Sequence, residues 1–253
     1  MISNKMPLVS IITPSYNSEK FISQTIKSIL VQTYTNWELL ITDDCSNDDT
    51  IKVIKKFKQQ DNRIKLFNLK TNKGAGEARN NSILNANGRF IAFCDSDDLW
   101  KKEKLQKQVD FLLKNNLAFT YSSYDVIGEK NRFIKQVLAP SEINYQKMLR
   151  NNYVGCLTAI YDSKKLGKHY MPKIRKRQDW VLWLKLIKII DKTKGQNESL
   201  ALYRNRSKSI SSNKIQLIKF NWNVYHIELG YGKIYSLFLI INFIFYYVKK
   251  NIS

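Results

Sequence analysis

The sequence is poor in the residues that build disulfide frameworks and zinc sites. Its 253 residues include three cysteines and two histidines. The cysteines form no CxxC pair, and neither His169 nor His226 stands at ligand spacing from another candidate. We therefore expect free thiols in a reducing compartment, and structural or surface roles for both histidines.

No secretory signal is expected, because the first seven residues, MISNKMP, hold no apolar stretch. The chain shows no internal repeat and no low-complexity linker. A hydrophobic content of 43% is enough for a substantial core. This excludes a disordered chain, and the length allows one large domain or two smaller ones.

Acidic residues are scarce in the second half of the chain. Asp and Glu number 21 against 42 Lys and Arg, and the net charge is +2 over residues 1–100 and +19 over residues 101–253. Such a basic surface suits nucleic acid, anionic lipid or a phosphorylated substrate. A solvated Lys-rich face is the alternative.

The most apolar stretch is short for a membrane span. Residues 234–248 are almost wholly apolar or aromatic, and Lys249 and Lys250 follow them. A spanning helix needs roughly 20 such residues. The stretch therefore predicts either an interfacial helix at a membrane surface or a helix packed on the catalytic domain or on a partner subunit.

Short apolar runs alternate with helical patterns over the first hundred residues. The predicted strands cover residues 9–13, 37–42, 64–67 and 90–94, and the predicted helices between them cover residues 18–30, 50–60 and 77–87. Ser18 is expected to cap the first helix and Gly88 to end the third. This alternation predicts right-handed βαβ units and a parallel sheet. Beyond it, the pattern predicts helices at 101–115 and 178–190 and a strand at 117–121.

Polar clusters follow all four predicted strands, at residues 14–17, 43–44, 72–76 and 95–98. Parallel sheets bind ligands beyond the carboxyl ends of their strands, so the clusters predict a nucleotide or a similar phosphorylated ligand. The last cluster places three carboxylates within four residues. Such crowding raises their pKa values unless a divalent cation compensates it. A solvated Asp-rich turn is the alternative.

Five motifs together resemble the inverting glycosyltransferases of family 2: VSIITPSYN at 9–17, DDCS at 43–46, NKGAG with ARN at 72–80, DSDD at 95–98 and RQDW at 177–180. The resemblance extends over residues 7–212. It implies an α/β fold of the GT-A type, a Rossmann-like, mostly parallel sheet flanked by helices. The nucleotide-sugar-binding half would cover 7–100, the acceptor-binding half of the same domain 101–212, and a C-terminal helical tail 213–253. Within the family the chain resembles bacterial enzymes that build teichuronic acid, capsular and O-antigen polysaccharides.

This resemblance implies a donor site for a nucleotide sugar. It assigns to the nucleotide Pro14, Tyr16, Asn17, Asp44, Asn72, Gly74, Arg79, Asp95 and Ser96. Asp44 would accept the N–H of the base, which favours uracil and hence a UDP-sugar, and Tyr16 would pack on the base. Structural packing of Tyr16, helix capping by the Asp43–Asp44 pair and a solvent-facing Arg79 are the alternatives.

By the same resemblance, Asp97 would hold Mg²⁺ or Mn²⁺, with Asp95 on the ribose or on a metal-bound water and Asp98 as an extension of the motif. Such an ion neutralises the charge that grows on the leaving diphosphate. Asp179 would be the catalytic base that takes the proton of the acceptor hydroxyl, and a helix N-cap is the alternative for it.

Further candidates flank these motifs. Arg177 and Gln178 directly precede the expected base. Arg204 belongs, with residues 209–211, to a late segment that closes over the diphosphate in the family. Arg206 is a departure, because a histidine is frequent in that segment.

Three other functions compete with this interpretation. An aspartate-nucleophile phosphatase leaves Asp44 and Asp179 without a role. A sugar-nucleotide nucleotidyltransferase needs a Gly-rich basic loop after the first strand, and residues 14–17 are not such a loop. A non-enzymatic basic module that binds RNA or membrane would explain the positive charge but would need none of the carboxylates.

We therefore expect a metal-dependent, inverting glycosyltransferase of bacterial surface polysaccharide biosynthesis. It would move a sugar from a UDP-sugar to a lipid-linked or glycan acceptor, without binding nucleic acid. It would work in the cytoplasm, peripherally on the anionic inner face of the cell membrane. The pattern is compatible with a monomer or an oligomer.

Overall fold

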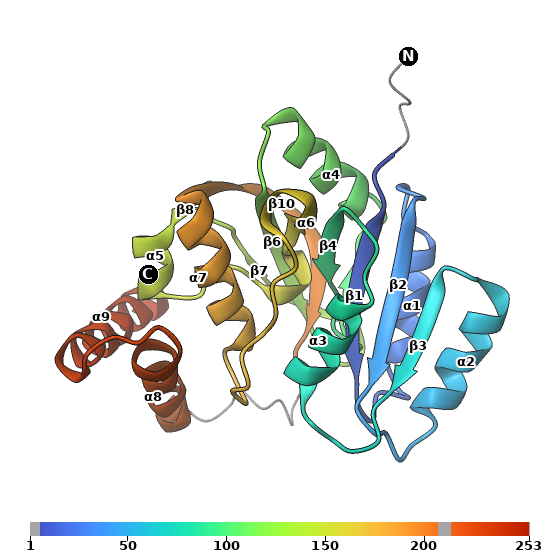
Figure 1. The fold of residues 1–253 in the computed structure, drawn as a ribbon, viewed down its shortest axis with the longest axis horizontal. Helices are drawn as coiled ribbons and strands as arrows, with labels where there is room; N and C mark the ends of the chain where they lie inside the picture. Colours follow the sequence, from blue (N-terminus) through green and yellow to red (C-terminus); the bar gives the residue numbers. More distant parts are fainter. Residues whose placement is uncertain (1–5, 207–213, 253) are drawn as a thin grey trace.

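The strands and helices of the first half alternate as predicted. The computed structural model describes residues 6–206 and 214–252. Its first elements are β1 (Val9–Ser15), α1 (Ile22–Leu30), β2 (Trp37–Asp43), α2 (Thr50–Gln60), β3 (Ile64–Asn68), α3 (Ala75–Leu84) and β4 (Phe90–Phe93) (Figure 1). These strands pair in parallel in the order β3-β2-β1-β4. The prediction of βαβ units is confirmed.

Ser18 does not cap α1, contrary to expectation. The helix begins at Ile22 without a side-chain cap. The Ser18 hydroxyl instead lies 2.7 Å from that of Ser96 and so joins the end of β1 to the loop after β4. A tertiary partner has replaced the local one.

Gly88 does not end α3 either. The helix stops at Leu84, and Gly88 lies against β1, where an added Cβ would stand 2.5 Å from the backbone nitrogen of Ser10. Glycine is needed here for close approach of two backbone segments rather than for a left-handed conformation.

The second half continues the sheet with mixed pairing. Its elements are β5 (Leu99–Trp100), α4 (Lys104–Lys114), β6 (Phe119–Ile127), β7 (Phe133–Val137), β8 (Glu142–Asn144), α5 (Tyr145–Arg150), the 3₁₀ turn η1 (Cys156–Thr158), β9 (Ile160–Asp162), α6 (Ser163–Leu166), α7 (Gln178–Ile190), β10 (Lys192–Arg204), α8 (Lys214–Trp222), the π-helical η2 (Asn223–Glu228) and α9 (Lys233–Ile252). β9 is antiparallel to both β4 and β6, whereas β10 runs parallel to β6. The parallel prediction therefore holds up to β4.

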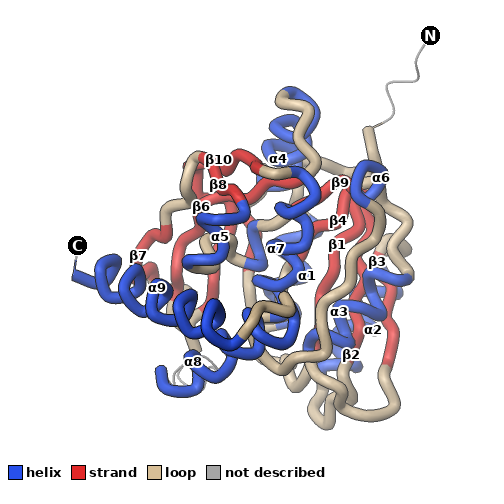
Figure 2. Tube along the Cα trace, turned by 60° about the vertical axis from the view of Figure 1, so that its left-hand side comes forward, coloured by secondary structure: helices blue, strands red, loops and turns tan. Residues whose placement is uncertain are grey.

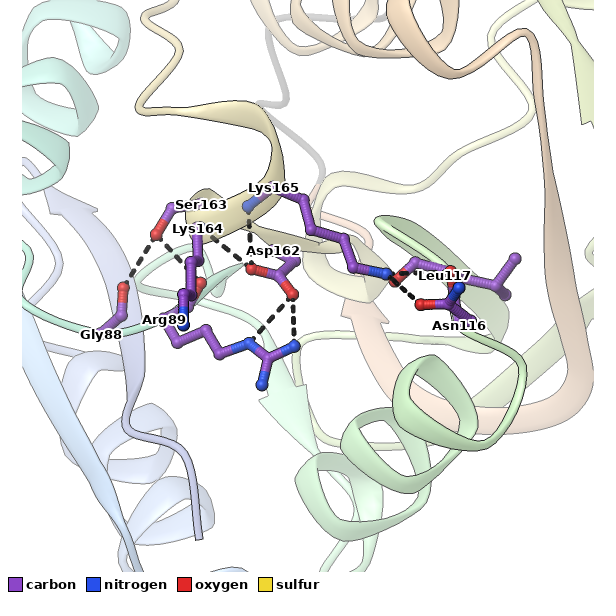
Figure 3. A network of polar contacts seen from close by, with 8 residues as sticks. All are labelled: Gly88, Arg89, Asn116, Leu117, Asp162, Ser163, Lys164 and Lys165. Atoms are coloured by element: carbon purple, nitrogen blue, oxygen red, sulfur yellow. Dashed lines mark hydrogen bonds and ion pairs between the residues drawn. The ribbon is translucent and has the colours of Figure 1, made fainter. Parts of the chain in front are cut away.

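Asp162 fixes the junction between the two halves of the sheet. Its buried carboxylate accepts hydrogen bonds from Nε and Nη2 of Arg89 at 3.0 and 2.8 Å (Figure 3). It also accepts from the backbone nitrogens of Lys164 and Lys165, which caps α6. These bonds hold β9 beside β4.

A hydrophobic core lies on each face of the sheet. Ile11 and Leu39 point to the side that α1, α2 and α4 cover, whereas their neighbours Ile12 and Leu40 point to the side of α3 and α7. The alternation follows from the two-residue period of a strand. Figure 2 shows helices on both faces of the sheet. The carboxyl ends of β1, β2, β3 and β4 are left at one edge.

Candidate active site

The loops after β1 and β2 are tied together by Asn17. Its backbone nitrogen donates to Ser46 Oγ at 2.9 Å, and its side-chain oxygen accepts from the backbone nitrogen of Asn47 at 3.0 Å. Asp43 accepts from the hydroxyls of Ser15 and Ser46 at 2.9 and 2.6 Å. Asn17 and Asp43 thus shape the floor of the predicted donor site.

Asp44 holds the glycine turn before α3. Its two carboxylate oxygens accept from the backbone nitrogens of Lys73 and Gly74, each at 2.7 Å. Gly74 has a φ of +90°, which favours glycine. The alternative of helix capping by Asp43 and Asp44 is wrong, because Asp48 bonds the backbone nitrogen of Thr50 at the start of α2.

Three other residues that were predicted to bind the nucleotide sugar differ in exposure. Tyr16, directly after β1, is 47% exposed, and Asn72 is exposed in the turn before α3. Pro14 is buried within β1, beside Thr42 of β2. Tyr16 therefore has a ring surface available to a ligand, whereas the Pro14 side chain belongs to the sheet.

Arg79 and Asp95 form a close ion pair between α3 and the loop after β4. Nη2 of Arg79 lies 2.6 Å from Oδ1 of Asp95. Arg79 is 8% exposed, so the alternative of a solvent-facing arginine is wrong. Its Nε has no hydrogen-bond partner among the residues that the structure describes. Burial lowers the pKa of Arg79, but the charge of Asp95, with Cys156 and Asp179, outweighs it and raises the pKa above its ordinary value.

Asp97 and Asp98 point to different partners. Oδ2 of Asp97 lies 2.9 Å from Nε of Arg206, whereas Oδ1 of Asp98 accepts from the backbone nitrogen of Arg204 at 2.9 Å. Burial raises the pKa of both carboxyls, well above the usual range for Asp98, and neighbouring carboxylates add to it. The run is thus not a solvated turn, and Asp98 supports the loop from inside.

Asp179 lies in the first turn of α7 and is held from outside the helix. Its Oδ2 accepts from Nδ2 of Asn152 at 3.0 Å. The capping position is occupied by Arg177, without a side-chain cap, so the N-cap alternative for Asp179 is wrong. Gln178 donates to the carbonyl of Ile174. Its amide also fills the space beside Gly76, which brings the glycine turn and the start of α7 together.

Cys156 and Asn152 were missed by the sequence analysis as neighbours of these carboxylates. The charges of Arg79, Asp95 and Asp179 all act on the thiol of the half-buried Cys156. Burial, the largest cause, raises the pKa of this thiol well above its usual value, which keeps it protonated and unsuited to nucleophilic attack. Neither residue belongs to a periodic pattern, so no signal in the sequence pointed to them.

Arg204 is buried and holds the loop of residues 95–98 in place. It is 2% exposed, and each guanidinium nitrogen has a protein partner, among them the carbonyl of Asp97 and the side chains of Asn131 and Gln24. The expectation that it reaches the diphosphate is therefore revised. Residues 209–211 of the same predicted segment lie outside the described residues.

A metal ion would fit this site if substrate phosphates supplied part of its ligands. No group of three His, Cys, Asp or Glu side chains within 6–206 and 214–252 could hold an ion. Mg²⁺ in nucleotide enzymes, however, takes one or two carboxylates and completes its shell with phosphates and water. Asp97, an oxygen donor that burial already disfavours as a lone anion, suits that arrangement.

The comparison with known families decides the class of enzyme. The model of the family "Glycosyl transferase family 2" matches residues 10–198. The chain belongs to glycosyltransferase family 2. It is therefore a glycosyltransferase, and the phosphatase, nucleotidyltransferase and non-enzymatic interpretations are set aside.

Two curated proteins are similar over nearly their whole length. The putative teichuronic acid biosynthesis glycosyltransferase TuaG of Bacillus subtilis is 42% identical over 225 residues, which cover 88% of this chain and 89% of TuaG. WfgD of Escherichia coli, a UDP-Glc:alpha-D-GlcNAc-diphosphoundecaprenol beta-1,3-glucosyltransferase, is 41% identical over 254 residues, 96% of this chain and 95% of WfgD. The predicted likeness to bacterial surface-polysaccharide enzymes is confirmed.

A solved structure confirms the fold class. TarS of Staphylococcus aureus, residues 1–349 in complex with UDP-GlcNAc, superposes with a TM-score of 0.71. The match covers 94% of this chain and 72% of that one, at 22% identity. The glycosyltransferase fold of the GT-A type thus extends beyond the residues of the family match.

Proposed function

We propose that this glycosyltransferase moves a sugar from a UDP-sugar to an acceptor linked to undecaprenyl diphosphate, with inversion at the anomeric carbon. The observation that carries the proposal is the meeting of three segments around one ion pair. Arg79 of α3 pairs with Asp95 after β4, and Asp179 of α7 acts on Arg79 through its charge. The donor and acceptor named in WfgD, a relative along nearly the whole chain, support the substrates.

The donor half is preorganised by its own hydrogen bonds. In this proposal Tyr16 packs on the base, and Asp44 accepts the N–H of uracil with a lone pair left free by its bonds to Lys73 and Gly74. Arg79 places a buried positive charge beside Asp95, where the diphosphate and ribose would lie. Because the loops are already tied together, little ordering is needed when the nucleotide binds.

Asp179 is the proposed catalytic base. Asn152 fixes its orientation, and its place in the first turn of α7 puts it at the positive end of the helix dipole. The carboxylate would take the proton of the acceptor hydroxyl as that oxygen attacks the anomeric carbon. The leaving diphosphate departs from the opposite face, so the configuration inverts.

Asp97 and Asp95 are the proposed ligands of Mg²⁺ or Mn²⁺. When bound, the ion supplies Lewis-acid stabilisation of the charge on the leaving diphosphate. Arg206 holds the same Asp97 carboxylate at 2.9 Å. Burial, the larger effect, raises the pKa of the Asp97 carboxyl, and the charge of this arginine lowers it.

The division of labour along the chain follows from this assignment. We propose that residues 7–100 bind the nucleotide sugar, that 101–212 bind the acceptor within the same domain, and that 213–253 form a tail. A lipid-linked acceptor also implies work at the cytoplasmic face of the membrane, on its anionic surface.

A donor panel tests the proposal. The full chain is incubated with Mn²⁺, a short-chain polyprenyl-diphosphate GlcNAc and each of several UDP-, GDP- and dTDP-sugars, and nucleotide release is measured. We expect UDP release and an extended lipid product, both dependent on the acceptor. Release of GDP or dTDP alone, or no lipid-linked product with any UDP-sugar, would overturn the substrate assignment.

A further inference from the structure

Helix α9 has two apolar faces, and one of them is packed on the protein. Its inner face consists of Ser236, Leu239, Ile240 and Phe243, all at most 5% exposed. The helix lies at the edge of the molecule beside α5 and α8 (Figures 1 and 2). The prediction that this stretch packs on the catalytic domain is thus correct for half of its surface.

The opposite face of α9 is apolar and uncovered. Its side chains, here called the outer face, are Ile234, Leu237, Phe238, Ile241, Ile244 and Phe245, each between 40% and 89% exposed. They recur at intervals of three and four residues, the spacing of one helical stripe. A contiguous apolar stripe of this size marks an interaction site rather than ordinary surface.

We infer that the outer face of α9 docks in the plane of an anionic lipid surface. Within 6–206 and 214–252 no helix is long and apolar enough to cross a membrane, whereas an amphipathic helix can lie in the interface with one face immersed. The charge is complementary, because residues 101–253 carry a net +19. Two exposed cations lie at α9 itself: Lys233 begins the helix, and Arg150 of α5 donates to the Tyr246 hydroxyl at 3.1 Å.

Tyrosines at the start of the helix suit the same surface. Tyr235, 42% exposed, lies against Tyr231, whose hydroxyl is 2.9 Å from that of Tyr145. Tyrosine is enriched at the boundary of lipid and water, where the ring is immersed and the hydroxyl stays hydrated. Lys249 and Lys250, which follow the apolar stretch in the sequence, have side chains outside the described part.

Helix α9 packs on α7, the helix that carries the proposed base. Phe243 of its inner face lies 6.1 Å, centroid to centroid, from Trp180, which directly follows the proposed base Asp179. A bilayer on the outer face would therefore lie on the same side of the molecule as α7, with α9 between them. This point rests on the proposed function, since it brings a lipid-linked acceptor toward the base.

Flotation with vesicles tests the docking surface. The full chain is mixed with phosphatidylglycerol-rich or phosphatidylcholine vesicles at low and high salt, without donor or acceptor. We expect flotation with the anionic vesicles at low salt, weakened by salt and by the neutral lipid. The double variant Phe238→Glu/Ile241→Glu should lose about tenfold or more of the bound fraction.

A matched control adds the same charge elsewhere. Leu84→Glu/Ile189→Glu changes two apolar residues that are 61% and 58% exposed on α3 and α7, and it should float like the unaltered chain. Equal flotation of both double variants, or no flotation of the unaltered chain, would overturn the inference. So would a dimer, seen by light scattering, that Phe238→Glu/Ile241→Glu converts to a monomer while neither form floats.

The outcome is separate from that of the proposed reaction. If the reaction assignment is correct, Phe238→Glu/Ile241→Glu should keep transfer to a short-chain, water-soluble acceptor and lose transfer to the vesicle-embedded one. Flotation without any transfer would contradict the proposed substrates and leave the docking surface standing.

Discussion

Nε of Arg206 lies 2.9 Å from Oδ2 of Asp97, so an arginine holds the carboxylate proposed as the metal ligand. Asp97 is mostly buried, with 17% of its side chain exposed. Burial raises its pKa, Arg206 lowers it, and Asp95 raises it again. A divalent ion held by Asp97 would therefore compete with the guanidinium of Arg206 for the same carboxylate.

Replacing Asp97 should remove the dependence of nucleotide binding on metal. We expect Asp97→Asn to bind UDP equally weakly with and without Mn²⁺ in calorimetry, because the neutral amide attracts the ion far less. Arg206→Gln is the matched control. It leaves the Asp97 carboxylate in place and removes the guanidinium that competes with the ion for it, so this variant should retain the response to Mn²⁺. A full Mn²⁺ response in Asp97→Asn would show that the ion binds elsewhere.

Replacing Asp179 should slow turnover and spare donor affinity. Asn keeps an oxygen that can accept from Asn152 but cannot take a proton, so kcat should fall by about 10² to 10⁴. Calorimetry should give a UDP affinity within about twofold of the unaltered enzyme, because a base acts on the acceptor. Asn152→Ala, which frees the carboxylate without removing it, should lose less. If Asp179→Asn turns over nearly normally, another residue is the base.

Gly88 should tolerate no side chain. A Cβ there would lie 2.5 Å from the backbone nitrogen of Ser10, so strand β1 must shift. We expect Gly88→Ala to lower the free energy of unfolding by about 1–3 kcal/mol in urea titrations. Gly128→Ala is the control, because its nearest neighbouring atom is 3.9 Å away, and it should stay within about 0.5 kcal/mol. Equal losses in the two variants would refute the packing argument.

The sequence predicted the strands and helices of residues 7–100 well because their signals are local. β1, β2 and β4 are buried along their whole length and read as apolar runs, and each is followed directly by its polar cluster. The parallel topology then carries these clusters to one edge without further information. The clusters that hold Asp44, Asp95 and Asp97 were predicted on this basis, and the family resemblance assigned the roles of the three residues.

Residues 101–206 resisted prediction for the opposite reason. β10, Lys192–Arg204, begins with polar residues and pairs with β6 through two register shifts, so it shows no steady alternation. Asn152 and Cys156 reach the site only because β9 enters the sheet antiparallel to β4. Ser18 and Gly88 were misjudged because long-range contacts replaced the helix caps that their residue types favour locally. Such contacts leave no periodic trace in the sequence.

A buried lysine should give the protein a measurable dependence of stability on pH. Lys104 is fully buried, donates from Nζ to Oε1 of Gln108 at 2.6 Å, and lies 3.9 Å from the centroid of the Trp100 ring. Burial lowers the pKa of Lys104 to about 7. The unfolded chain keeps this proton up to about pH 10.4, so between these values it binds more protons than the native state. Stability therefore rises with pH across that window, and the full cost of the buried charge is present below pH 7.

Removing that charge should stabilise the protein more in acid than in alkali. We expect the effect of Lys104→Met on the free energy of unfolding to be more favourable at pH 6 than at pH 9 by about 2–3 kcal/mol. The loss of the hydrogen bond to Gln108 is common to both conditions and cancels in the difference. Lys102→Met, at an exposed position, should show no such difference. Urea titrations at the two pH values measure both variants. A Lys104→Met effect that is equal at pH 6 and pH 9 would mean that Lys104 keeps an ordinary pKa in the folded protein.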